Sequence, residues 1–223
     1  GKKFDQDLAK LQTYHLDKKA KNAIVKMKVD MEDYRQVLKL LAHNYHELEK
    51  LKEVMDVEAV HMEKQLKGLI KVHEDELEIL ETSANIDIKE IAAQTHLVES
   101  LLEAEIATLK ISHAQVEFLL DKKISRVADM EHHFDKLYLE LKKSIDFVTH
   151  LHTPEAEKKH DISELNKIID EARQYQQQVS QVILDEMHIE GELNELVHDL
   201  EEIEAYTAAL DEQATMILHE VRS

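Results

Sequence analysis

Apolar residues recur along the chain at alternating spacings of three and four, the pattern of helices that pack lengthwise in a coiled coil. The first stripe, over residues 27–48, comprises Met27, Met31, Tyr34, Leu38, Leu41, Tyr45 and Leu48. The second, over residues 98–127, comprises Val98, Leu102, Ile106, Leu109, His113, Val116, Leu120, Ile124 and Val127. Similar stripes follow over residues 162–183 and 193–221, so we expect helix almost throughout.

Two short interruptions divide this pattern. Residues 82–87 are of types that cap helices and favour turns. At the second interruption, Thr153 is suited to cap a helix and Pro154 to occupy its first position. The sequence therefore predicts a single all-α domain over residues 1–223, with long helices at about 5–82, 87–152 and 154–222. Short connections make successive helices antiparallel, in an elongated coiled-coil bundle roughly 100 Å long.

The composition excludes several classes of enzyme. The 223 residues include 3 Gly, 1 Pro and no Cys. Sheets with many hairpins need glycine-rich turns, and phosphate-binding loops need several glycines in one short stretch. Without cysteine the chain forms no disulfide and offers no thiolate ligand for zinc. We therefore predict a non-enzymatic protein with no catalytic residues and no cofactor.

The chain is strongly acidic, with 47 Asp and Glu against 28 Lys and Arg and a formal net charge of -19. This charge argues against nucleic acid as a partner, since binding there depends on neutralisation of phosphates by Lys and Arg. No apolar run is long enough to span a membrane and no signal peptide is visible, which predicts a cytoplasmic protein. The first residue is Gly rather than Met, which leaves open the alternative that a membrane anchor was removed.

One group of residues has the chemistry of a metal site. His113 occupies a stripe position on the second predicted helix, with Glu117 one turn further. Folding at the second interruption brings Glu186 and Glu190 of the third helix to the same level. Such a layer could bind a divalent metal, but it contains only one His. The favoured interpretation is a polar layer that fixes helix register, and no metal is predicted.

The second predicted helix carries another stripe that points away from the first. It comprises Ala104, Ala107, Ile111, Ala114 and Phe118. A three-helix rod leaves this stripe exposed, together with Val57 and Val60 at the same level of the first helix. Small alanines permit another helix to approach closely, and the larger residues supply apolar area, so we predict a homodimer seam here. Scattered exposed apolar residues, common on any surface, are the alternative.

Three functional hypotheses follow from these features. The favoured one is a non-enzymatic coiled-coil scaffold or spacer that binds a second copy of itself and other proteins through helix–helix contacts. Three long helices in 223 residues resemble the architecture of BAR domains, and this resemblance implies a dimeric module that binds anionic membranes. The lysines that would contact such a surface are Lys18, Lys19, Lys21, Lys122 and Lys123. The net negative charge disfavours membrane binding, and a metal-binding helical bundle is the third hypothesis.

Overall fold

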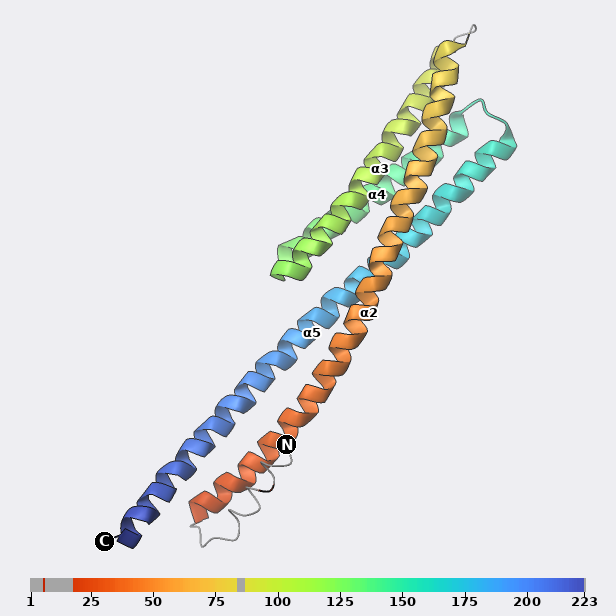
Figure 1. Cartoon of the computed structure of the whole chain (residues 1–223). Coiled ribbons are helices and arrows are strands. Elements are labelled where there is room, and N and C mark those ends of the chain that lie inside the picture. Colours follow the sequence, from red (N-terminus) through yellow and green to blue (C-terminus); the bar gives the residue numbers. More distant parts are fainter. Residues whose placement is uncertain (1–5, 7–17, 84–86, 223) are drawn as a thin grey trace. The chain divides into compact units, whose positions relative to one another are not determined.

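The computed structural model describes residues 6, 18–83 and 87–222 and is all-α, as the sequence predicts (Figure 1). Its helices are α2 (Lys18–Thr82), α3 (Ile88–Asp121), α4 (Ile124–His150) and α5 (Glu155–Arg222). The described residues contain no strand, and none of their helices combines the length and apolarity that crossing a membrane requires. The predicted start of the first helix near residue 5 lies outside the described residues.

The prediction of three long helices is wrong in one place. Instead of one helix over residues 87–152, the structure has two, α3 and α4, which lie against each other along their length (Figure 1). The chain reverses between them, so α4 runs antiparallel to α3. A hydrogen bond from Ser100 Oγ to Glu140 Oε2 (3.0 Å) joins the two helices across 40 residues of sequence.

The reversal is made by one backbone conformation and one carboxylate. Lys122 has a positive φ of 53°, in the left-handed region that glycine normally occupies at the end of a helix. Its N–H donates to the carbonyl of Phe118 (2.8 Å) and ends α3. The Asp121 carboxylate accepts a hydrogen bond from the N–H of Lys123 (3.0 Å), and this bond lowers the pKa of Asp121. Because neither Gly nor Pro marks the position, the apolar pattern alone does not indicate the break.

The second predicted interruption is present, but its cap differs from the expected one. α5 begins at Glu155, one residue after Pro154. The carbonyl of Pro154 accepts hydrogen bonds from the N–H groups of Glu157 (2.9 Å) and Lys158 (3.1 Å). The hydroxyl of Thr153, which the sequence suggests as the cap, is buried without a hydrogen-bond partner. The predicted role of Thr153 is therefore wrong.

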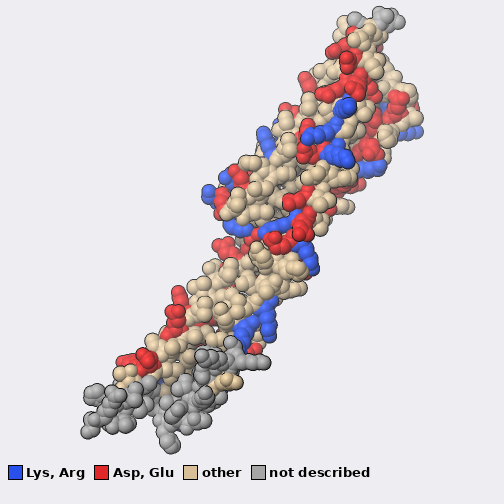
Figure 2. Space-filling model, in the orientation of Figure 1, with Lys and Arg blue, Asp and Glu red and all other residues tan. Residues whose placement is uncertain are grey.

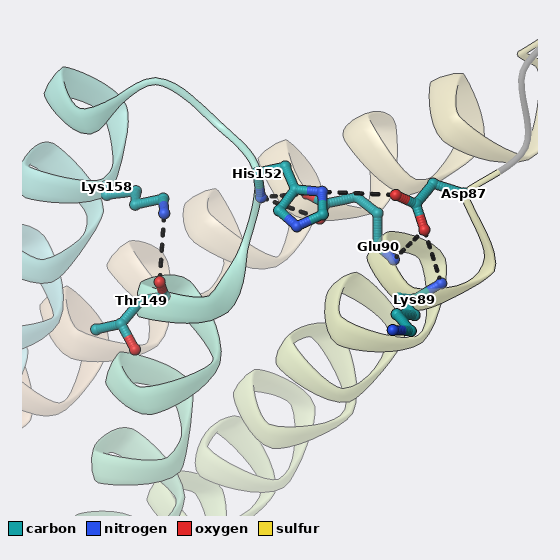
Figure 3. Close-up of polar contacts among 6 residues, drawn as sticks. All are labelled: Asp87, Lys89, Glu90, Thr149, His152 and Lys158. Atoms are coloured by element: carbon teal, nitrogen blue, oxygen red, sulfur yellow. Dashed lines mark hydrogen bonds and ion pairs between the residues drawn. The ribbon is translucent and has the colours of Figure 1, made fainter.

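The turn between α4 and α5 is tied to the start of α3 (Figure 3). Asp87 caps α3 by accepting hydrogen bonds from the N–H groups of Lys89 (3.0 Å) and Glu90 (3.3 Å). The buried Glu90 carboxylate accepts the N–H of His152 in the turn, at 2.8 and 3.0 Å. The His152 ring lies between both carboxylates, with Nδ1 3.5 Å from Asp87 Oδ2 and 3.3 Å from Glu90 Oε2. These contacts hold α3 against the α4–α5 turn.

The chain divides into two compact units. The four-helix unit, residues 49–184, contains the second half of α2, all of α3 and α4, and the first half of α5. The helix-pair unit contains residues 1–48 and 185–223, of which the described helices cover 18–48 of α2 and 185–222 of α5. Hydrogen bonds between neighbouring helices of the four-helix unit join Gln94 to His73, Ser100 to Glu140, Tyr138 to Gln176 and Gln65 to Glu171.

Tyr175 of α5 lies at the centre of the four-helix unit. It is fully buried, packs edge-on against Phe134 of α4 with 5.7 Å between ring centroids, and donates a hydrogen bond to Gln115 of α3. Burial raises the pKa of Tyr175 to about 12, so its hydroxyl remains a donor at neutral pH. The stripe expected over residues 162–183 is buried around it; its most buried members are Leu165, Ile169, Ala172 and Val179.

In the helix-pair unit, α2 and α5 meet along a mixed seam. Ile24 and Met27 of α2 form an apolar cluster with Ile203 of α5. Further along the pair, the side chain of Asn44 donates a hydrogen bond to the buried Glu192 (2.9 Å). The pairing of early α2 residues with late α5 residues shows that the two helices are antiparallel.

An acidic cluster crosses this seam. One carboxylate oxygen of Asp30 on α2 and one of Asp199 on α5 are buried without a hydrogen-bond partner. Burial raises the pKa of Asp30, and the charges of Glu202, Asp199 and Asp33 raise it further, while Lys26 lowers it. The charged form of Asp30 is therefore disfavoured in the folded helix pair.

Replacing Lys122 by glycine should stabilise the protein. We expect Lys122→Gly to raise the free energy of unfolding by about 1 kcal/mol, since glycine adopts a positive φ without a steric penalty. Lys122→Ala keeps the penalty and loses the contact of the ammonium with the Phe118 ring, at 5.9 Å, so it should give no gain. Urea unfolding followed by circular dichroism measures both variants, and equal stabilities would contradict the strain argument.

Stability should also depend on the protonation of Asp30. A group whose pKa is raised on folding stabilises the fold when protonated, so this contribution is complete below the ordinary value of 3.8 and is lost as pH rises through the raised pKa. Asp30→Asn should remove that part of the pH profile and stabilise the fold at neutral pH by up to about 1 kcal/mol. Urea unfolding at a series of pH values tests this.

The matched control is Glu32→Gln. Glu32 is exposed and lies 3.5 Å from Arg35 on the same helix, so its replacement should give no stabilisation. A gain as large as that of Asp30→Asn would show that general charge reduction, rather than the seam, is responsible.

Candidate functional site

The face of α3 predicted to form a dimer seam is buried inside the four-helix unit. Its residues, each at most 5% exposed, are Ala104, Ala107, Ile111, Ala114 and Phe118. Alanines on this face allow α4 to approach α3 closely. The predicted seam is therefore wrong, because these residues pack within one chain and leave no surface for a second. Its two members on α2, Val57 and Val60, do remain exposed.

The other apolar face of α3 is exposed, although the sequence pattern assigns it to the core. We call its five exposed residues the α3 stripe: Leu102, Ile106, Leu109, Val116 and Leu120, with exposed fractions between 37% and 80%. The buried and exposed faces of α3 are exchanged relative to the prediction because the chain turns back after Asp121. Because α4 returns along the alanine face, the α3 stripe is left on the outside of the unit.

A shallow groove of about 440 Å³ lies beside the middle of the α3 stripe. The residues that line it are Leu109, Lys110, His113, Ala114, Glu117, Asp129 and His133. The Nδ1 atom of His133 is buried without a hydrogen-bond partner. Burial, and next the charge of Lys110, lower the pKa of His133, so its ring is neutral at neutral pH. Beside the stripe, the groove thus combines apolar and charged side chains with one neutral ring.

Charged side chains also meet beside this groove. Glu117 Oε2 lies 2.9 Å from Nη1 of Arg126 on α4. The same oxygen lies 3.7 Å from Nδ1 of His113, whose side chain is 75% exposed. The Glu117–Arg126 pair joins α3 to α4 at the surface and leaves His113 projecting between the two halves of the α3 stripe.

Acidic residues outnumber basic ones on α3 itself along the stripe. Residues 99–121 contain five Asp and Glu and a single Lys. Four of the acids pair with bases of the chain: Glu103 with Lys136 of α4, Glu105 with Lys67 of α2 (3.7 Å), Glu117 with Arg126 of α4 (2.9 Å) and Asp121 with Lys123 (3.2 Å). In Figure 2, uncharged surface over α3 lies between scattered charged side chains. A helix that docks on the α3 stripe therefore meets an apolar strip with an acidic rim, in which four of the five acids already pair with a base.

The residues of the predicted metal layer are divided between the two units. His113 and Glu117 belong to the four-helix unit, whereas Glu186 and Glu190 belong to the helix-pair unit. Within residues 18–83 and 87–222, no group of three or more His, Cys, Asp or Glu side chains is placed to hold a metal ion. His113 and Glu117 form a surface pair instead.

The lysines of the membrane hypothesis are divided in the same way. These exposed residues are Lys18, Lys19, Lys21, Lys122 and Lys123. The first three lie at the start of α2 in the helix-pair unit, and the last two form the α3–α4 reversal in the four-helix unit. Their expected place at one end of a bundle requires an unbroken helix over residues 87–152, which α3 and α4 replace.

The α3 stripe combines contiguous apolar area, an adjacent groove and a charged rim, which are the features of a surface that binds a helix. No protein-family model matches this chain, and no curated protein or solved structure matches it. Its function is therefore inferred from the surfaces of its own two units.

The assignment of the two α3 faces can be tested by truncation. Ile111→Ala, in the buried face, should lower the free energy of unfolding by about 2–5 kcal/mol. Leu109→Ala, in the exposed α3 stripe, should change it by less than about 0.5 kcal/mol. Urea unfolding measures both, and similar losses in the two variants would contradict the assignment.

Proposed function

We propose that this protein is a non-enzymatic helical scaffold that acts through helix–helix contacts, with other proteins and with a second copy of itself. The observation that carries the proposal is the α3 stripe, in which five large apolar residues stand in line on the outside of an already packed unit. The stripe is the docking face for one amphipathic helix of a partner protein.

The spacing of the stripe suits a docked helix. Its residues recur every three or four positions from Leu102 to Leu120, with His113 at the one intervening position that is not apolar. This length of α3 is roughly 27 Å. The apolar side chains of a partner helix fill the spaces between stripe residues, as knobs enter holes. The groove beside Leu109 and His113 supplies one of these spaces.

Burial of the stripe supplies the driving force for docking. Complete burial of one Leu, Ile or Val side chain contributes roughly 1.5–3 kcal/mol. The stripe residues are already partly covered, so each gains only a fraction of this on docking. The summed burial free energy of the five residues, less the free-energy cost of association, corresponds to a moderate affinity. Local charge can raise or lower this affinity.

The acidic rim determines the charge of the partner. Five Asp and Glu against one Lys over residues 99–121 favour a basic helix over an acidic one, although four of these acids already pair with bases of the chain. The expected partner is therefore an amphipathic helix with Lys or Arg on both sides of its apolar face. Such complementarity affects the association rate and the choice of partner more than the final affinity.

A synthetic peptide tests this proposal directly. The probe is a helix of three heptads with Leu at the apolar positions and Lys at the flanking positions. We expect the full chain to bind it, and Leu109→Gln with Val116→Gln to weaken binding by roughly tenfold or more. Fluorescence anisotropy of the labelled peptide measures the affinity, and added salt should weaken it because exposed charges are screened.

Two controls separate docking from general attraction to an acidic protein. Val57→Gln with Val60→Gln removes two exposed apolar residues of α2 outside the stripe and should leave the affinity unchanged. A peptide with the same apolar positions but Glu at the flanks should bind more weakly. Equal binding by both double variants, or by a scrambled basic peptide, would overturn the proposed docking face.

A further inference from the structure

The helix-pair unit carries an apolar surface of its own. Leu38 and Tyr45 of α2 and Leu193 and Leu200 of α5 have exposed fractions between 40% and 57%. We call these four residues the pair edge. Val197, 55% exposed, lies between the two leucines of α5 and extends this surface.

The four residues of the pair edge lie on one side of the helix pair. Each follows a seam residue by four positions; these seam residues are the buried Ile189 and Leu196 on α5 and the partly buried Tyr34 and Leu41 on α2. Four residues turn a helix about 40° past one full turn, in the same sense on every helix. In an antiparallel pair, equal rotation from the seam leads to the same side, so the pair edge is one surface.

No described helix covers the pair edge. In the four-helix unit, α3 and α4 add buried residues to those of α2 and α5 and complete a core. In the helix-pair unit, the described residues belong to α2 and α5 apart from residue 6. Among the described residues, the pair edge therefore has no covering helix and stays exposed.

The two helices of the pair carry opposite charge. Residues 18–48 of α2 contain seven Lys and Arg against four Asp and Glu, whereas residues 185–212 of α5 contain eleven Asp and Glu and no Lys or Arg. Within this unit, Figure 2 shows blue side chains toward α2 and red side chains toward α5. Five of the seven bases lie within residues 18–28, so a partner that lies across both helices must present both signs of charge toward that end of the pair.

We infer that the pair edge binds the pair edge of a second copy of this chain, so that two helix pairs form a four-helix bundle with α2 of each copy beside α5 of the other. The inference rests on the self-association in the proposed function, but it does not involve the α3 stripe. It assigns the homodimer to a surface in the helix-pair unit.

A second copy satisfies the geometry and the charge together. Two-fold symmetry brings the same surface together from both copies. Each residue of the pair edge therefore contributes to the interface twice, once from each copy. With the axis parallel to the helices, like helices lie diagonally and each basic α2 has an acidic α5 on either side. A partner of one charge sign would instead be repelled by one of the two helices.

Sedimentation of the full chain over a concentration series tests the inference. The parent should dimerise, and Leu38→Gln with Leu193→Gln should raise the dimer dissociation constant by roughly tenfold or more. Val25→Gln with Val29→Gln removes two exposed apolar residues of the same unit outside the pair edge and should leave the constant unchanged. Circular dichroism should show equal helix content in all three proteins.

A parent that stays monomeric at every concentration would overturn the inference, as would an edge variant that dimerises as well as the control. Neither result affects peptide binding to the α3 stripe, because that assay uses a different surface and measures a monomer–peptide complex. Failure of the homodimer and failure of the docking face are therefore distinguishable.

Cysteine cross-linking tests the arrangement of the helices. The chain contains no cysteine, so a single introduced one reports unambiguously. Leu38→Cys and Leu193→Cys chains, mixed and mildly oxidised, should form mainly the mixed disulfide that joins α2 of one copy to α5 of the other. Val25→Cys in place of Leu38→Cys should form little. A preference for disulfides between identical chains would overturn the arrangement with α2 beside α5.

Discussion

The close packing of α4 along the alanine face of α3 decides which surfaces of the four-helix unit are available. That face, with Ala104, Ala107 and Ala114, lets the returning helix approach to the distance at which backbone and side chains pack densely. The bulkier leucine face of α3 is left exposed, since no further helix among the described residues of this unit covers it. The exposed α3 stripe is thus a consequence of the chain reversal.

The reversal itself depends on a few local interactions rather than on a strong turn sequence. Lys122 accepts a positive φ, and Asp121 offers its carboxylate to the next N–H. At the other end of the hairpin, the Glu90 carboxylate accepts a hydrogen bond from the backbone N–H of His152 in the α4–α5 turn. The free-energy cost of the strained backbone at Lys122 is small compared with the free energy gained by burying apolar area between α3 and α4. Packing therefore determines where the helix breaks.

The sequence predicts well where helices form, but predicts poorly which face of a helix is buried. Particular residues show why. Apolar spacings of three and four identify α2, α5 and the start of α3, because any helix with one buried face shows them. The stripe over residues 162–183 is correctly assigned because α5 has one dominant apolar face there. α3 has two apolar faces, and periodicity cannot rank them. The choice depends on the break at Lys122, a non-glycine residue in a glycine conformation, for which the sequence offers no signal.

Charge can sort the two exposed apolar surfaces between different partners. Around the α3 stripe, five acids and one lysine would face the same set in a second copy, so pairing of two stripes places like charges together. Toward the end of the helix pair beyond the pair edge, the basic residues 18–28 of α2 and the acidic part of α5 are complementary when two copies meet. With a net charge of -19 opposing indiscriminate association, the surface with opposite charges favours self-pairing. The surface with one sign of charge favours a basic helix from elsewhere.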